Sequence, residues 1–123
     1  MAKVKLTPQD FEVVSGNDKE LNVTVLNEIG EPIDLTGSVI VWAYSRKATN
    51  KTRIQTYTSP SNITIILPQT GSNIGKLRID VQAVDTEPLV DKYYHEARMF
   101  AGGKKTTIMY GTMNVLANII DVP

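Results

Sequence analysis

The sequence has no cysteine, a single histidine and no net charge. Its 123 residues include 13 Lys and Arg against 13 Asp and Glu. Without cysteine there is no disulfide framework, no thiolate nucleophile and no cysteine-ligated metal. Without net charge there is no overall field to attract nucleic acid or an anionic membrane. The composition therefore predicts a domain held by packing alone, with neither nucleic acid nor membrane as a partner.

Long apolar runs are also missing. No segment approaches the roughly 18 apolar residues of a membrane span. The start, MAKVKLTPQD, lacks the apolar run of a signal peptide, so we do not expect secretion through one. Hydrophobic residues make up 41% of the chain, enough for one two-layer core. We expect a single domain over residues 1–123.

Alternation of apolar and polar residues is the main pattern that is present. It predicts antiparallel strands with one buried face. The expected strands are 21–25, 39–44, 63–67, 77–83, 93–100 and 106–117. Residues 39–44 are apolar on both faces, as expected of a central strand or of one beneath a partner. With turn residues between these segments, about seven to nine short strands are typical of an immunoglobulin-like antiparallel β-sandwich.

One helical turn is expected between the strands, over residues 85–90. Pro88 would lie in its first positions, where a missing N–H costs little. Asp85 or Thr86 would cap it.

The stretch MFAGGKKTT, residues 99–107, is rich in the residue types of a phosphate-binding loop. That loop needs a glycine five residues before its Gly-Lys pair and a Ser or Thr directly after the lysine. Arg98 and Lys105 occupy those two positions. The β-branched residues that follow favour a strand rather than a helix. Gly102 and Gly103 are therefore predicted to form the tight turn of a hairpin.

Catalytic groups are scarce. A triad, a His-Asp dyad or a zinc site would have to include His95, and its only suitable neighbour, Glu96, points to the opposite face of the expected strand. We interpret His95 as a hydrogen-bonded strand residue. Outward-facing carboxylates such as Asp80 are expected to solvate the sheet. No catalytic residue, metal ligand or cofactor site is predicted.

Five short motifs in order resemble one bacteriophage family. They occur within LNVTVLNEIGEPIDLTGSVIVWAYSRK, residues 21–47, and GKLRIDVQAVDTEPLVDKYYHEARMFAGGKKTTIMYGTMNV, residues 75–115. The matching positions are Gly30 and Pro32, Asp34-Leu35-Thr36-Gly37 with Trp42, Asp85-Thr86 with Leu89, Tyr93-Tyr94 before Gly102-Gly103, and Gly111 with Val115. The chain thus resembles the N-terminal domain of phage baseplate upper proteins and related immunoglobulin-like virion domains.

This resemblance implies a non-enzymatic structural domain of a phage tail, baseplate or neck. Such a domain would be made in the host bacterial cytoplasm, dock on other phage structural proteins and repeat as a homo-oligomer in the virion. Lys104 and Lys105, at the expected hairpin tip, would offer charge to a neighbouring subunit. The tail, residues 116–123, would be a partner-contacting extension in which Ile119, Ile120 and Val122 favour strand addition.

The residues themselves leave a second function open, a carbohydrate- or receptor-binding sandwich that contacts a host surface glycan. Its stacking platforms would be exposed aromatic rings from the set Trp42, Tyr44, Tyr57 and Tyr110. Trp42 is more often a core residue in such a strand, and a buried Trp42 would weaken this alternative.

The packing expectations are specific. Leu35 should close one end of the core while Asp34 or Thr36 holds the turn. Tyr93 should form a tyrosine corner, with its hydroxyl on backbone. Met109, Gly111, Met113 and Val115 should face the Tyr93 strand.

Overall fold

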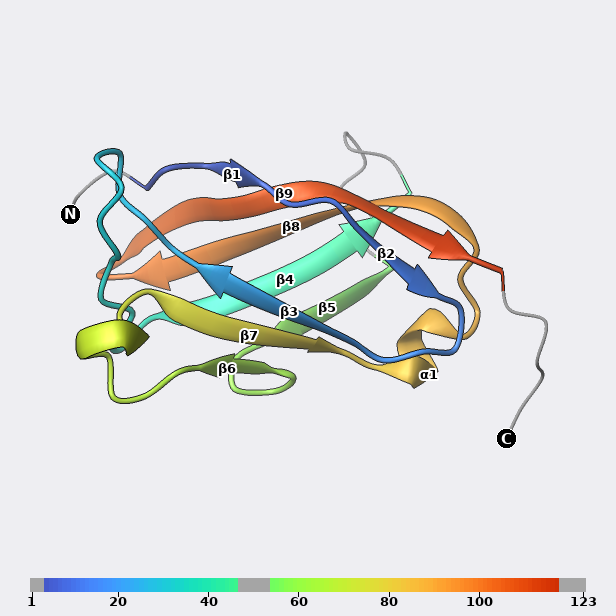
Figure 1. Ribbon diagram of the computed structural model, residues 1–123, viewed down its shortest axis with the longest axis horizontal. Coiled ribbons are helices and arrows are strands. Elements are labelled where there is room, and N and C mark those ends of the chain that lie inside the picture. Colours follow the sequence, from blue (N-terminus) through green and yellow to red (C-terminus); the bar gives the residue numbers. More distant parts are fainter. Residues whose placement is uncertain (1–3, 47–53, 118–123) are drawn as a thin grey trace.

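The computed structural model describes residues 4–46 and 54–117, and two β-sheets pack face to face there (Figure 1). This arrangement confirms the predicted all-β sandwich. The larger sheet is β1 (Thr7–Pro8), β2 (Phe11–Val14), β4 (Val39–Ser45), β5 (Gln55–Thr58), β8 (Asp91–Ala101) and β9 (Lys104–Leu116). The smaller sheet is β3 (Lys19–Thr24), β6 (Ile63–Ile65) and β7 (Lys76–Val81). Two short helices, η1 (Gly71–Asn73) and α1 (Ala83–Thr86), lie in connections.

The strand order is immunoglobulin-like. The large sheet runs β1-β9-β8-β4-β5, and β2 also pairs with β9; the small sheet runs β3-β7-β6. The long β8–β9 hairpin and β4 form the centre of the large sheet. The facing sets β3-β7-β6 and β9-β8-β4 follow the strand order of immunoglobulin-like sandwiches, and β5 adds one strand beside β4.

Two parallel pairings depart from the predicted antiparallel pattern. β1 and β2 lie in succession along β9, and both run parallel to it. All other strand pairs are antiparallel, as expected. The N-terminal segment therefore extends the large sheet beyond β9.

The core lies between the sheets and is built by strand alternation. Ile40, Trp42 and Tyr44 of β4 point inward, and their neighbours Val41 and Ala43 lie on the outer face, half-buried. The β8–β9 register pairs Ala97 with Met109, His95 with Gly111, Tyr93 with Met113 and Asp91 with Val115. The predicted row of Met109, Gly111, Met113 and Val115 is thus confirmed.

The Asp-Leu-Thr-Gly turn folds as expected. The Leu35 side chain is fully buried at one end of the core. The Thr36 backbone N–H and hydroxyl both donate to the Asp34 carboxylate, at 2.9 and 2.6 Å. Gln69 was not singled out from the sequence, and it is buried. Its side-chain oxygen Oε1 accepts hydrogen bonds from the backbone N–H groups of Leu35 and Gly75, at 2.9 Å each.

Tyr93 forms the predicted corner. Its hydroxyl donates to the Val90 carbonyl oxygen at 3.0 Å, and the Val90 N–H lies 3.2 Å from the same hydroxyl oxygen. The ring is buried and contacts Tyr44 edge-on. These bonds fix the point at which the chain enters β8.

The predicted helical turn was wrong in its position. α1 begins at Ala83 rather than Asp85, and Pro88 follows the helix instead of opening it. The Asp18 carboxylate, from the loop before β3, accepts the Ala83 N–H at 2.6 Å. The cap therefore comes from a distant segment, which the local sequence does not reveal. Within the described residues no helix is long and apolar enough to cross a membrane.

Candidate functional site

The MFAGGKKTT stretch is a hairpin turn, as predicted. Ala101 pairs with Lys104 across the two glycines, and Gly102 and Gly103 have φ angles of 56° and 76°. Two consecutive positive φ angles are those of a type I′ turn, which glycines adopt without strain. Lys104 and Lys105 start β9 and are exposed. Both lysines are therefore accessible to a partner, and their contact with a neighbouring subunit stays a prediction.

The other predicted partner contacts are Ile119, Ile120 and Val122. They lie outside the residues that the structure describes.

His95 is buried within the core and bonded on both ring nitrogens. The Trp42 indole N–H donates to His95 Nδ1 at 3.0 Å, and His95 Nε2 lies 2.6 Å from the Gln9 carbonyl oxygen. An indole can only donate and a carbonyl can only accept. His95 is therefore neutral, with its proton on Nε2. The predicted hydrogen-bonded strand role is confirmed, and the Trp42 partner is an addition.

The electrostatics agree with this assignment. Burial lowers the pKa of His95, against smaller opposing effects of the Gln9 hydrogen bond and the Asp10 charge. The Phe11 ring contacts the imidazole edge-on, with 5.0 Å between ring centroids. His95 thus ties β4, β8 and the segment before β2 together.

A second polar cluster lies where α1 meets β5. The Asp85 carboxylate accepts the Tyr57 hydroxyl and the Gln55 amide, and the Gln82 N–H donates to the Tyr57 oxygen at 3.0 Å. Burial and this carboxylate raise the pKa of Tyr57. Burial, with the charge of Asp85, raises the pKa of Tyr44 to about 12. Because both Asp85 oxygens accept internal bonds, the cluster fastens α1 to the large sheet.

Of the four proposed stacking platforms, three are inaccessible. Trp42, Tyr44 and Tyr57 are 0%, 2% and 4% exposed, and Tyr110 is 43% exposed. Of these four rings, Tyr110 alone is accessible for stacking on a sugar, which weakens the carbohydrate alternative.

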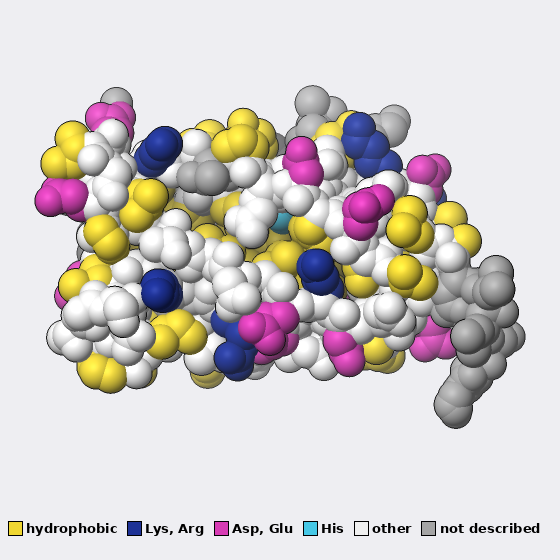
Figure 2. Space-filling view, in the orientation of Figure 1, with side chains coloured by type: hydrophobic (Ala, Val, Ile, Leu, Met, Phe, Trp, Pro, Cys, Tyr) yellow, Lys and Arg dark blue, Asp and Glu magenta, His cyan; other side chains and the backbone are white. Residues whose placement is uncertain are grey.

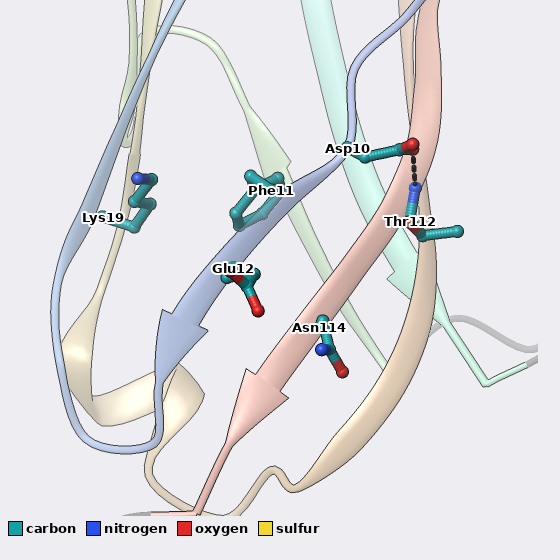
Figure 3. A pocket seen from close by; sticks show the side chains of 6 residues that line it. All are labelled: Asp10, Phe11, Glu12, Lys19, Thr112 and Asn114. Atoms are coloured by element: carbon teal, nitrogen blue, oxygen red, sulfur yellow. Dashed lines mark hydrogen bonds between the residues drawn. The ribbon is translucent and has the colours of Figure 1, made fainter.

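An open pocket lies at the edge of the sandwich, beside the β1–β2 segment. It is lined by Asp10, Phe11, Glu12, Lys19, Thr112 and Asn114 (Figure 3). The Thr112 N–H donates to the Asp10 carboxylate at 2.9 Å, and this bond lowers the pKa of Asp10. Figure 2 shows apolar side chains at the floor of a hollow between the β1–β2 segment and the small sheet.

Among the described residues no group of three His, Asp or Glu side chains is placed to hold a metal ion. Within the same part of the chain every buried side-chain N or O atom has a hydrogen-bond partner.

The remaining surface of interest is the outer face of the large sheet. Strand alternation places on it Val39, Val41, Ala43, Ser45, Thr56, Thr58, Lys92, Tyr94, Glu96, Arg98, Phe100, Lys105, Thr107, Tyr110, Thr112 and Asn114. Glu96 and Arg98 form an ion pair at its middle, 3.4 Å apart. Residues 39–44 are apolar on both faces, and this was the sequence signal for this surface; the central ion pair was not anticipated.

Comparison with known proteins gives no family assignment. No protein-family model matches the chain, and no curated protein matches it.

Proposed function

We propose that this chain is a non-enzymatic structural protein of a bacteriophage virion, in the tail, baseplate or neck, that acts by docking on other virion proteins. The observation that carries the proposal is the ordered set of five motifs resembling baseplate upper protein domains. In the structure the motif residues have scaffold roles. Leu35 closes the core, Tyr93 forms the corner, and Gly102 and Gly103 turn the hairpin.

The polar interior supports a scaffold role as well. The side chains of His95, Asp85 and Gln69 are each hydrogen-bonded to other parts of the same chain. Their bonds join distant segments and rigidify the sandwich. A rigid body with interaction surfaces on its outside suits assembly by surface complementarity, repeated by symmetry.

The test is the composition of phage particles from the host that carries this gene. After purification on a density gradient, quantitative mass spectrometry should find the chain at a fixed whole-number ratio to the major tail proteins. Particles that infect normally and contain none of the chain would contradict the proposal. The genes beside this one should encode other virion proteins.

A further inference from the structure

The small sheet has an open edge at β3. Among the described residues β3 pairs with β7 alone, in the order β3-β7-β6. The Asp80 N–H of β7 donates to the Asn62 carbonyl oxygen, on the side of β6, so the residues on either side of Asp80 bond to β3. In this register the backbone N–H and C=O groups of Glu20, Asn22 and Thr24 point away from β7. They are a template on which a further strand can pair.

The far edge of the large sheet, at β5, is closed by contrast. Its outward backbone groups belong to Thr56 and Thr58. The Gln55 side chain accepts the Thr56 N–H at 3.0 Å, and the Thr58 carbonyl oxygen accepts the Ser61 N–H at 2.9 Å. These local bonds occupy groups that a further strand would need. In the described part of the chain β3 has no such bonds along its open edge.

The N-terminal segment shows which strand direction this edge accepts. Just beyond β3, Val4 pairs antiparallel with Asn27, and the Lys5 N–H donates to the Leu26 carbonyl oxygen at 2.8 Å. The segment then leaves this edge and pairs with β9 through β1 and β2. The position beside β3 that it begins to fill therefore suits an antiparallel strand.

The space beside the open edge is hollow, with an apolar floor. The pocket at the edge of the sandwich is lined by Phe11 of β2 and by Lys19, the first residue of β3 (Figure 3). Figure 2 shows the apolar side chains at the floor of the hollow. Leu21 and Val23 of β3 are buried on the side that faces the large sheet. A strand laid on β3 would therefore turn alternate side chains toward apolar surface and the others toward solvent.

We propose that residues 118–123 of a neighbouring copy, the tail, bind this edge as an antiparallel strand. The tail lies outside the described residues, and its sequence is NIIDVP. Six extended residues span about 20 Å, which matches the six residues of β3. β9 ends at Leu116, and β2 lies between β9 and the hollow. A tail that turned back around β2 would have too few residues left to pair along its own β3, so its length selects the β3 edge of another copy.

One register suits both sequences. The inward pairs are Ile120 with Val23 and Val122 with Leu21. Asp121 then lies opposite Asn22 on the solvent side. A shift of the tail by one position along β3 would turn Ile120 and Val122 to solvent, and a shift by two would place Asp121 opposite Glu20 or Thr24. The Glu20 alternative opposes like charges, which is unfavourable.

A contact between a tail and an edge is heterologous, so it closes into a ring or continues as a filament. This inference deepens the proposed docking function and rests on it, but its tests need only the purified full-length chain. Sedimentation velocity from 1 µM to 1 mM should show species of the wild type that grow with concentration. A wild type that stays monomeric at 1 mM would overturn the inference.

Cysteine cross-linking tests the occupant and the register, because the chain has no cysteine of its own. In a glutathione redox buffer, a mixture of Asn22→Cys and Asp121→Cys should form a disulfide between the two variants, since residues opposite one another in paired strands have Cα atoms about 5.5 Å apart. Mass spectrometry would identify the joined peptides. The double variant N22C/D121C should give multimers on a non-reducing gel. A disulfide within one chain would show that the edge holds its own tail, which contradicts the proposal.

The control for cross-linking is Thr64→Cys mixed with Asp121→Cys. Thr64 of β6 is exposed and lies in the same row of the small sheet as Asn22, on the other side of Arg78. The yield of its disulfide should be at least ~10-fold lower than that of Asn22→Cys. Equal yields would mean that the thiols meet by random collision, and the proposed register would be wrong.

A proline tests the backbone bonds of the edge. Asn22→Pro removes an N–H that the tail uses and β7 does not, so association should weaken at least ~10-fold. Asn22→Ala keeps the N–H and should associate like the wild type, and circular dichroism and thermal unfolding would verify both folds. Equal association of the two folded variants would overturn the inference. None of these results bears on whether the chain is present in phage particles, so the proposed function is tested separately.

Discussion

At the scale of single residues, His95 joins the most distant parts of the fold. Its Nδ1 accepts from Trp42 of β4, and its Nε2–H donates to Gln9, which precedes β2. The Trp42 bond requires the neutral ring, because a proton on Nδ1 would oppose the indole N–H, whereas the Nε2–H bond to Gln9 can form in either state. The negative charge of Asp10 favours the imidazolium form of His95 and so opposes the lowering of its pKa. The positive charge of Lys92 in turn contributes to the lowered pKa of Asp10.

This geometry makes stability depend on pH in a defined direction. Because burial lowers the pKa of His95 in the fold below its ordinary value of 6.5, the unfolded chain binds the proton first. The stabilising effect is complete above pH 6.5 and is lost as pH falls from there toward the folded pKa. Chemical denaturation should show the unfolding free energy dropping over that range by up to ~1.4 kcal/mol per pH unit.

The matched variant is His95→Gln, whose amide offers one acceptor and one donor but does not titrate. In this variant the unfolding free energy should no longer fall just below pH 6.5, but it should still fall in the more acidic range where carboxylates titrate. Hydrogen bonds from Thr112 and Thr36 lower the pKa values of Asp10 and Asp34 from 3.8, so their contributions vanish only in more acidic solution. An unchanged slope in His95→Gln would refute the assignment, as would ¹⁵N shifts of an Nδ1–H tautomer.

At the scale of elements, the N-terminal segment passes unusually close to β9. At Gly111 an added Cβ would lie 2.6 Å from the Gln9 carbonyl carbon and 2.9 Å from Asp10 Oδ1. The Gln9 N–H donates to the Tyr110 carbonyl oxygen at 2.7 Å, which holds the backbones together between β1 and β2. Glycine is thus required here by close approach.

Gly111→Ala should therefore displace the β1–β2 segment and break its bonds to His95 and Thr112. Overpacking against backbone typically costs about 1–3 kcal/mol, and the lost hydrogen bonds add to it. Thermal unfolding should show a clear drop in Tm. Hydrogen exchange should show loss of protection in residues 9–14 before the rest of the sheet.

Gly103→Ala is the control for the added methyl group. Nothing lies within 4 Å of a Cβ at Gly103, although its φ of 76° carries strain of roughly 1–2 kcal/mol. Gly103→Ala should lower the stability of the whole domain, and hydrogen exchange should not show an early loss of protection in residues 9–14. Equal exchange profiles in the two variants would show that the contact at Gly111 does not hold the segment.

Elements that alternate regularly were predictable, and those built by distant contacts were not. The strands around Trp42, Tyr93 and Met113 follow from period-two burial. β1 and β5 are short and largely polar, and they are strands because β9 and β4 offer free edges. α1 starts where the Asp18 carboxylate caps it. The hairpin lysines followed from turn chemistry and the outward position of Glu96 followed from strand alternation, whereas the Glu96–Arg98 ion pair was not anticipated.

At the scale of the whole molecule, the two ends of the sandwich differ. The β8–β9 hairpin lies at one end, and α1 with the β2–β3 connection lies at the other (Figure 1). Lys104 and Lys105 are adjacent exposed positive charges at the tip of this hairpin, in a chain whose 13 basic and 13 acidic residues cancel. Such a tip can orient the molecule toward an acidic neighbour without changing its net attraction to solutes.

Replacing both residues, in the variant K104S/K105S, should weaken incorporation into phage particles and leave the fold intact. Exposed charge pairs contribute about 0.5 kcal/mol each, so the loss is about 1 kcal/mol, or roughly fivefold in affinity. Quantitative mass spectrometry of particles from a complemented deletion strain would measure copies per particle, and thermal unfolding would report the fold. The control K76S/K92S removes two exposed lysines elsewhere and should assemble like the wild type. Equal loss in both variants would mean that net charge, rather than the hairpin tip, governs assembly.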